Sequence, residues 1–165
     1  MNKIVISDTT ALIVFAKSDT LFLLSNLFQK VYIPKAVYDE LMAKEDIVKY
    51  RIKTFGLLEQ KFVSNVEIFE KIKLFKLDKG EAEAISLALE LDLMLIIDEK
   101  KGRKIALNQG LKIVGTLGVL IENYRKRFVS YDELKLNFLL FKEQGLRISE
   151  ELEKVFFEKL KKEKI

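Results

Sequence analysis

The chain of 165 residues is 49% hydrophobic, which suffices for one domain with a substantial core. It contains neither Cys nor His, so disulfides, Ser–His triads and Cys or His metal ligands are excluded, and any metal held by oxygen atoms alone would be Mg²⁺ or Mn²⁺. The net charge of +4 is compatible with a polyanionic partner.

In chain order, the apolar pattern predicts strands alternating with helices. KIVIS (3–7) predicts a strand, 10–19 and 19–29 predict helices, and VYI (31–33) predicts a second strand. Pro34 suits the first turn of a helix over 36–45, and residues 46–76 predict a helix, a short strand near KFV (61–63) and another helix. A helix over 78–91, a strand at 93–97, a helix over 100–109, a strand at 111–114 and a helix over 116–127 follow. Ser130 and Glu133 have capping-box spacing for a helix over 131–143 ending at Gly145, and Ser149 caps a last helix.

Strands that are solid apolar runs, separated by helices, indicate an α/β fold with a Rossmann-like central parallel sheet covered on both faces. Ligands of such sheets bind beyond the carboxyl ends of the strands. Asp8 and Asp98 each directly follow a predicted strand, so both carboxylates are expected at that edge. Glu81 shares a helical face with apolar Ile85, and Glu40 shares one with Val37, so both acids are expected to point inward.

Each acid also has a purely local interpretation. Asp8 and Asp98 are placed to cap the helices that follow them, and Glu81 is placed to complete a capping pair with Asp78. Glu40, beside Asp39, also fits a solvated acid, and Glu83 is of a type that is more often a surface acid. The functional interpretation rests on the predicted convergence of Asp8, Glu40, Glu81 and Asp98 at one edge. Such a cluster repels itself unless a divalent cation neutralises it, and that cation can activate water for phosphodiester hydrolysis.

The ordered segments SDTTALI, IPKAVYDEL, GEAEAISLALE, LIIDEKKGRKIA and GLKIVGTLGVL resemble the PIN-domain family, particularly its prokaryotic branch of toxin–antitoxin ribonucleases, over residues 3–127. The resemblance implies a three-layer α/β/α fold and Mg²⁺- or Mn²⁺-dependent cleavage of single-stranded RNA. It implies that the catalytic and metal-binding acids are Asp8, Glu40, Glu81 and Asp98. Many toxin members carry Thr-Asn-Asp at the later strand end, whereas this chain has Ile-Ile-Asp-Glu.

Supporting roles are expected for neighbours of these acids. Thr9 or Thr10 would contribute a hydroxyl, Glu83 is an alternative to Glu81, and Glu99 would supply polar help beside Asp98. One turn past Asp98, Arg103 and Lys104 would contact the RNA backbone, or simply form a solvated basic face. GTLGVL (115–120) lacks phosphate-loop spacing, so its glycines are expected to permit close helix–sheet packing.

Residues 1–130 are expected to form the nuclease domain and 131–165 a helical C-terminal extension. The extension has apolar positions at helical spacing, namely Leu134, Phe138, Phe141, Leu152, Val155, Phe156 and Leu160. These side chains are expected to pack on the domain or at a subunit interface, and we predict a homodimer.

The function predicted from the sequence is that of a metal-dependent endoribonuclease, the toxin of a toxin–antitoxin pair, with an antitoxin protein as partner. The alternative is a catalytically weak PIN-like module that binds nucleic acid or a partner, and a third interpretation makes Asp8 the phosphate acceptor of a phosphotransfer domain. Apolar runs too short for a bilayer and the lack of a signal-peptide pattern predict a cytoplasmic protein without membrane contact. High Lys and Glu content and a single Pro suit a thermophile.

Overall fold

The computed structural model describes residues 3–163, within which the chain forms strands and helices in near-regular alternation. The strands are β1 (Ile4–Ser7), β2 (Lys30–Ile33), β3 (Leu58–Gln60), β4 (Met94–Ile96) and β5 (Ile113–Val114). The helices are α1 (Thr9–Lys17), α2 (Phe22–Leu27), α3 (Lys35–Met42), α4 (Ile47–Thr54), α5 (Val66–Lys73), α6 (Lys79–Leu91), α7 (Lys100–Asn108), α8 (Thr116–Arg125), α9 (Tyr131–Glu143) and α10 (Glu150–Lys162). None of the helices in this described part is long and apolar enough to cross a membrane.

The strands form one sheet in the order β3-β2-β1-β4-β5, and every neighbouring pair is parallel. The central strand β1 pairs Ile6 with Tyr32 of β2 on one side and with Leu95 of β4 on the other. All carboxyl ends of the strands therefore lie at the same edge of the sheet, as the sequence predicted.

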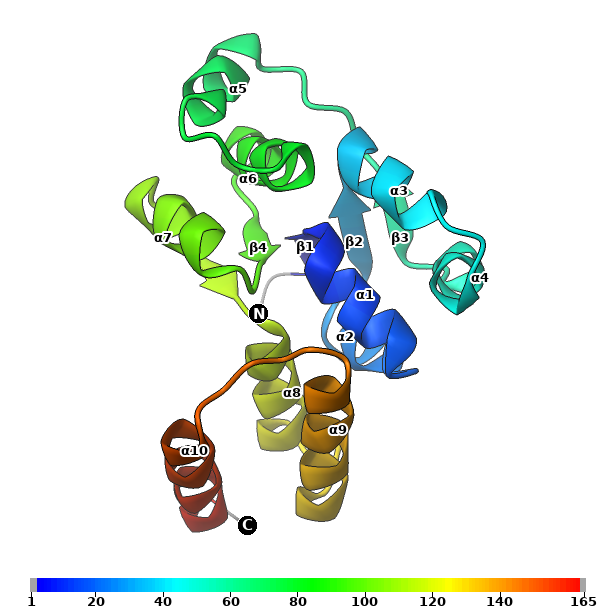
Figure 1. Ribbon diagram of the computed structural model, residues 1–165, viewed down its shortest axis with the longest axis vertical. Helices are drawn as coiled ribbons and strands as arrows, with labels where there is room; N and C mark the ends of the chain where they lie inside the picture. The colour runs from blue at the N-terminus through cyan, green and yellow to red at the C-terminus, as the bar shows by residue number, and fades with distance from the viewer. Residues whose placement is uncertain (1–2, 164–165) are drawn as a thin grey trace.

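Side chains of the central strands alternate between two apolar clusters, one on each face of the sheet. Val5 and Ile96 belong to the cluster that includes α1, α2, α8 and α9, whereas Ile6 and Leu95 belong to the cluster that includes α6 and α7. Figure 1 shows these two groups of helices on opposite sides of the strands. The predicted three-layer α/β/α fold is thereby confirmed, and the solid apolar runs are explained because both faces of each strand are buried.

Several element boundaries differ from the predictions for identifiable reasons. The second helix begins only at Phe22, because Asp19 adopts a left-handed conformation with φ of 56° and interrupts the helical path. Pro34 is the N-cap of α3 rather than a residue of its first turn. The third strand lies at Leu58–Gln60 instead of 61–63, because residues 58–60 are the ones that pair with Val31–Ile33 of β2.

The two C-terminal helices pack on the preceding domain. Phe141 of α9 is fully buried and its ring meets that of Phe15 edge to face, with 5.7 Å between centroids. Phe156 and Phe157 of α10 in turn contact the ring of Phe138. Within 131–163 the helices thus contribute to the main core, while 164–165 of the predicted extension and 1–2 of the predicted nuclease domain lie outside the described residues.

Candidate active site

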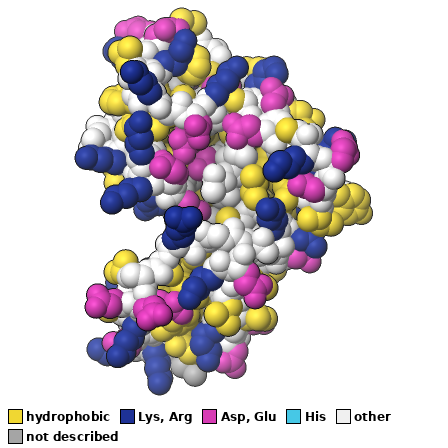
Figure 2. Space-filling model, in the orientation of Figure 1, with side chains coloured by type: hydrophobic (Ala, Val, Ile, Leu, Met, Phe, Trp, Pro, Cys, Tyr) yellow, Lys and Arg dark blue, Asp and Glu magenta, His cyan; other side chains and the backbone are white. Residues whose placement is uncertain are grey.

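The carboxyl edge of the sheet brings together the ends of β1 and β4. Ser7 pairs with Ile96, and the backbone N–H of Asp8 donates to the carbonyl of Ile96 over 3.1 Å. Asp8 and Asp98 therefore emerge from adjacent strands. In Figure 2 a group of acidic side chains lies over α6 and β4, with Lys and Arg side chains beside it over α7. The edge is thus acidic at its centre and basic at one margin.

Asp8 is the most deeply buried of the four acids, with 1% of its surface exposed. Its Oδ1 accepts a hydrogen bond of 3.0 Å from the backbone N–H of Ala11, so it caps α1. Its Oδ2 is buried and has no hydrogen-bond partner among the described residues. The pKa of Asp8 is raised from 3.8 to about 7, mainly by burial; the Ala11 hydrogen bond opposes the rise, and the charges of Asp98, Glu81 and Glu40 add to it.

Glu81 lies in the first turn of α6 and is half-buried. Burial is the main cause that raises its pKa to about 7, and the charges of Glu99, Asp78 and Glu40 add to it. Asp78 stands at the N-cap of α6 as predicted, but its side chain makes no capping hydrogen bond. A hydrogen bond from the Asp78 backbone to Glu81 acts in the opposite direction on this pKa, so Glu81 makes its half of the predicted capping pair while it is held among like charges.

Glu40 differs from the prediction in its orientation. Its side chain is exposed rather than turned into the core, because Val37 and Leu41 occupy the buried face of α3. Its Oε1 nevertheless reaches the start of α6, where a Cβ placed on Gly80 would come within 2.5 Å of it and within 3.2 Å of Thr9 Oγ1. The absence of a side chain at Gly80 allows α6 to approach Glu40 and Thr9 this closely.

Asp98 is oriented by the start of α8. Its Oδ1 accepts a hydrogen bond of 2.8 Å from the backbone N–H of Thr116, so it does not cap the helix that follows it. Burial raises the pKa of Asp98, while the Thr116 hydrogen bond and Arg103 act in the opposite direction. A Cβ on Gly115 would lie 2.7 Å from this Oδ1. Gly115 thus makes room for the carboxylate, and of the two glycines in GTLGVL only Gly118 fits the predicted packing role, against Val114.

Of the predicted supporting residues, Thr9 lies beside the acids, whereas Glu83 and Glu99 bind backbone N–H groups. The Thr9 hydroxyl is buried and has no partner among the described residues, whereas Thr10 is exposed. Glu83 is buried and its Oε1 accepts from the backbone N–H of Ala36 over 3.3 Å. Glu99 caps α7 through the N–H of Gly102. This arrangement favours Glu81 over Glu83 as the third acid, since Glu81 and not Glu83 is among the charges that raise the pKa of Asp8.

The two residues proposed to contact RNA have different surroundings. Arg103 is half-buried and donates from Nη1 to the carbonyl of Ile97 over 2.7 Å, so part of its guanidinium is engaged within the fold. Lys104 is exposed. A contact between either residue and RNA stays a prediction.

The donor set at this edge fits a divalent cation of the Mg²⁺ or Mn²⁺ type. It consists of carboxylate and hydroxyl oxygens, two of which, Asp8 Oδ2 and Thr9 Oγ1, are buried without partners among the described residues. Within residues 3–163, no three acidic side chains form a ready-made metal-binding group. Mutual repulsion of the carboxylates favours that open arrangement in the protein alone.

Sequence reasoning missed Gly80, Gly115 and Thr116, which shape the site without supplying a carboxylate. Only the position of Gly115 and Thr116 directly after the strand LKIV could have indicated them, since polar and small residues after parallel strands lie at the ligand edge. Gly80 could not be found this way, because its role depends on how closely α3 and α6 approach.

The chain was compared with solved structures and with curated proteins, and the first of the two structures below shares its fold. VapBC2 from Rickettsia felis, in a crystal structure bound to a DNA fragment from their promoter, matches with a TM-score of 0.52 and 16% identity over 68% of this chain and 98% of that chain. A PilT N-terminus domain protein from the hyperthermophilic archaeon Sulfolobus solfataricus P2 matches with a TM-score of 0.47 and 16% identity, over 73% of this chain and 93% of that one. No curated protein matches the sequence.

A family model provides the assignment. The model described as DUF3368, a PIN domain, matches residues 4–162, nearly the whole chain and including the two C-terminal helices. PIN domains are generally nucleases that depend on divalent metals, which agrees with the oxygen-donor edge described above. By fold and by family model, the chain belongs to the PIN-domain family.

Proposed function

We propose that this protein is a Mg²⁺- or Mn²⁺-dependent endoribonuclease that cleaves single-stranded RNA. The observation that carries the proposal is the buried carboxylate of Asp8, whose Oδ2 has no partner among the described residues and which lies within electrostatic range of Asp98, Glu81 and Glu40. A fold gains nothing from burying such a group alone, since an unpartnered buried polar atom costs free energy. A function that needs the carboxylate accounts for it.

Asp8, Glu81 and Asp98, with Glu40 at the exposed margin, are the residues that would hold the cation. A bound divalent metal supplies Lewis acidity, lowers the pKa of water and offsets negative charge on a phosphate oxygen. The chain itself orients the oxygen donors, because the Ala11 and Thr116 backbone N–H groups each bind one oxygen of Asp8 and Asp98. To hold a cation, Asp8 and Glu81 would have to give up the protons that their raised pKa values, both about 7, let them retain near neutral pH.

RNA is the substrate class that best fits the surroundings of the acids. Figure 2 shows basic side chains beside the acidic group over α7, the helix that carries the exposed Lys104, and these charges would attract a phosphate backbone. Without His or Cys, the chain has neither a Ser–His couple nor a cysteine nucleophile. We further propose that the enzyme is the toxin of a toxin–antitoxin pair, supported by the shared fold with the Rickettsia felis VapBC2 structure.

The test compares cleavage by the wild-type chain and by Asp8→Asn. A 5′-labelled single-stranded RNA is incubated with Mn²⁺, with Mg²⁺ and with EDTA, beside duplex RNA and single-stranded DNA. We expect Asp8→Asn to lose cleavage at least 100-fold, because a neutral amide is a poorer ligand for a hard cation. Asp132→Asn is the control, since Asp132 is exposed and lies in the first turn of α9, in another part of the fold. Equal cleavage by wild type and Asp8→Asn would refute the assignment.

One observation favours the catalytically weak alternative, namely that residues 3–163 contain no finished group of three metal-binding acids. A module that only binds would retain RNA or a partner protein and show no metal-stimulated cleavage in the same assay. For the toxin role, the measurement is growth arrest on expression of the chain and its relief by the protein encoded in a neighbouring small reading frame.

A further inference from the structure

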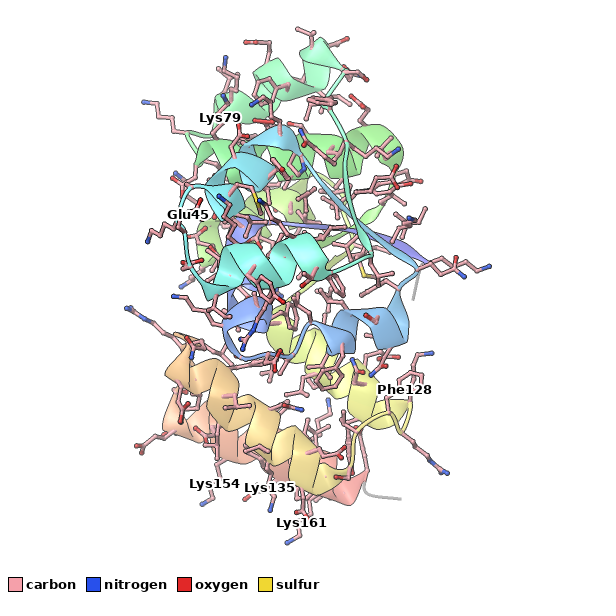
Figure 3. The ribbon with its side chains drawn as sticks, turned by 90° about the vertical axis from the view of Figure 1, so that its right-hand side faces the viewer. Glu45, Lys79, Phe128, Lys135, Lys154 and Lys161 are labelled. Atoms are coloured by element: carbon pink, nitrogen blue, oxygen red, sulfur yellow. The ribbon has the colours of Figure 1, made fainter. Side chains whose placement is uncertain are left out.

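A cavity lies next to the acidic edge, and none of Asp8, Glu40, Glu81 and Asp98 lines it. It has a volume of about 240 Å³ and is lined by residues of the loop after β3 and of the helices α3, α5 and α6. Lys35 begins α3 and Lys79 begins α6, so the cavity lies where the N-terminal ends of these two helices meet the loop. Figure 3 labels Lys79 in the part of the molecule where α3, α5 and α6 lie together.

The walls of this cavity include apolar side chains that the fold leaves in water. Phe62 is 66% exposed and Val66 is 71% exposed, although both line the cavity. Phe69 lies deeper and packs against the core of that face. An exposed aromatic ring beside a cavity offers a stacking surface, and every nucleobase has a flat face that can stack on it. The exposure of the Phe62 ring is thus not explained by packing within the fold, and the ring is well placed to stack on a nucleobase.

The charges around the cavity determine which end of a nucleotide can enter. Glu83 is 8% exposed and lines the cavity from α6, so its carboxylate disfavours a phosphate inside. Lys35 and Lys79 also line it. Lys35 forms an ion pair with Asp39, whereas Lys79 makes no ion pair within residues 3–163. An uncharged base inside the cavity avoids repulsion by Glu83, and a phosphate placed against Lys79 pairs with its positive charge.

The cavity and the acidic edge share one turn of α6. Lys79 faces the cavity, Gly80 lies against Glu40 and Thr9, and Glu81 belongs to the acidic group. Lys79 and Glu81 lie two residues apart in the first turn of α6, and side chains at this spacing point to different sides of a helix, so a strand held by Lys79 would pass over this turn to reach the acids. A nucleotide bound in the cavity therefore fits a strand whose next phosphate reaches the cleavage site.

We propose that this cavity is a nucleobase-binding subsite of the RNA substrate, in which one unpaired base stacks on Phe62 and its phosphate contacts Lys79. The inference rests on the proposed function and specifies how the strand is held. It also accounts for a preference for single strands, because a base can enter the cavity only when it is unpaired.

The experiment measures binding, not cleavage. Fluorescence anisotropy in EDTA follows the full chain with a labelled single-stranded RNA heptamer and with a heptamer of the same length and charge that lacks all bases. Phe62→Ala should weaken binding of the intact heptamer about 5- to 150-fold, the range expected for loss of one base–aromatic stack. The same variant should bind the abasic heptamer as wild type does. Phe62→Trp should preserve binding of both.

Two further variants separate stacking from charge. Lys79→Gln should weaken binding of both heptamers by a similar factor, because it removes a phosphate contact that does not depend on the base. Phe22→Ala is the matched control, since Phe22 is 49% exposed but lies on α2, away from the cavity. It should leave binding of both heptamers unchanged.

Equal loss of both heptamers in Phe62→Ala, or no loss of either, would overturn the subsite, as would a wild-type chain that does not prefer the intact heptamer. If Phe62 instead belongs to a surface that binds a protein partner, Phe62→Ala will weaken binding of neither heptamer. The two proposals fail separately. A chain that never cleaves RNA but shows the Phe62-dependent preference retains the subsite, and a chain that cleaves RNA without that preference retains only the nuclease.

Discussion

Replacing Asp8 by Asn should make the metal-free protein more stable at alkaline pH. Burial and neighbouring acids raise the pKa of Asp8 from 3.8 to about 7, and one pKa unit corresponds to about 1.4 kcal/mol. The folded state thus loses about 4 kcal/mol of stability when Asp8 must ionise. Asn keeps the side-chain oxygen that accepts from the Ala11 N–H and is as good an N-cap as Asp. The substitution therefore removes the charge and preserves the cap.

The direction of the pH dependence follows from proton binding. Between about pH 4 and pH 7 the folded chain keeps the Asp8 proton that the unfolded chain has released, so the stability due to this proton decreases as pH rises and is gone above about pH 7. The free energy of unfolding of wild type relative to Asp8→Asn should thus fall by about 2–4 kcal/mol between pH 4 and pH 8.5.

Urea unfolding in EDTA at pH 4, 6, 7 and 8.5 measures the difference. Asp46→Asn serves as control, since Asp46 is exposed and caps α4 with a bond to the Lys49 N–H. It should change the free energy of unfolding by no more than about 0.5 kcal/mol. If Asp8→Asn is less stable than wild type at pH 8.5 without metal, the carboxylate serves the fold and the reasoning from burial is refuted.

Three other predictions concern the cation, Gly80 and assembly. The affinity for Mn²⁺, measured by calorimetry, should rise up to about tenfold per pH unit for each proton displaced and level off above about pH 7, where Asp8 and Glu81 are ionised; an affinity independent of pH would contradict this. Gly80→Ala places a methyl group 2.5 Å from Glu40 Oε1, so it should reduce cleavage. Its unfolding free energy should change by less than about 1 kcal/mol. Gly56→Ala, where the added methyl group meets open space, should change neither cleavage nor stability. Light scattering should find a homodimer that is disrupted by Leu139→Glu or Leu152→Glu, two exposed apolar positions of α9 and α10; a full-length monomer at micromolar concentration rules the dimer out.

The assembly test uses point substitutions because removal of α9 and α10 would damage the core of the domain itself. A chain ending at Arg127 would lose Phe138 and Phe141, which are fully buried in the main core cluster. Removal of two such side chains would cost several kcal/mol and leave Phe15 without its ring partner. On α9 and α10, Leu136, Leu139, Leu152 and Val155 remain exposed, so within the extension these side chains are available to a second copy.

The sequence allowed prediction of those strands whose burial on both faces leaves an uninterrupted apolar run. β1 and β4 are buried on both faces, so their apolar runs are continuous and each visibly ends at an acid. β3 is an edge strand with the sequence Leu-Glu-Gln and no fully buried residue, so its position depended on pairing with β2 and was misplaced. The caps at Ser130 and Ser149 were predictable from local spacing, whereas Asp98 does not cap α7 and the Asp78 side chain makes no capping hydrogen bond.

The candidate site was predictable only where its geometry follows from the strands. The common edge of parallel strands places Asp8 and Asp98 together without knowledge of strand order. The orientation of Glu40 was predicted incorrectly because two faces of α3 carry apolar residues, and only packing decided that Val37 and Leu41 are buried. The roles of Gly80 and Gly115 depend on distances between elements far apart in sequence, which no local pattern contains.

The structure also weighs the local interpretation of Asp8 against the functional one. Asp8 does cap α1, so the local role exists. A cap alone, however, would be served equally well by Asn, Ser or Thr without a buried charge. The fold instead keeps an acid that is 1% exposed, with an unpartnered Oδ2 and other carboxylates nearby. We infer that a chain which keeps this buried acid, where Asn would serve the cap, uses the charge for a function rather than for the fold. The partner that we propose for it is a divalent cation, whose binding would offset the repulsion among these carboxylates.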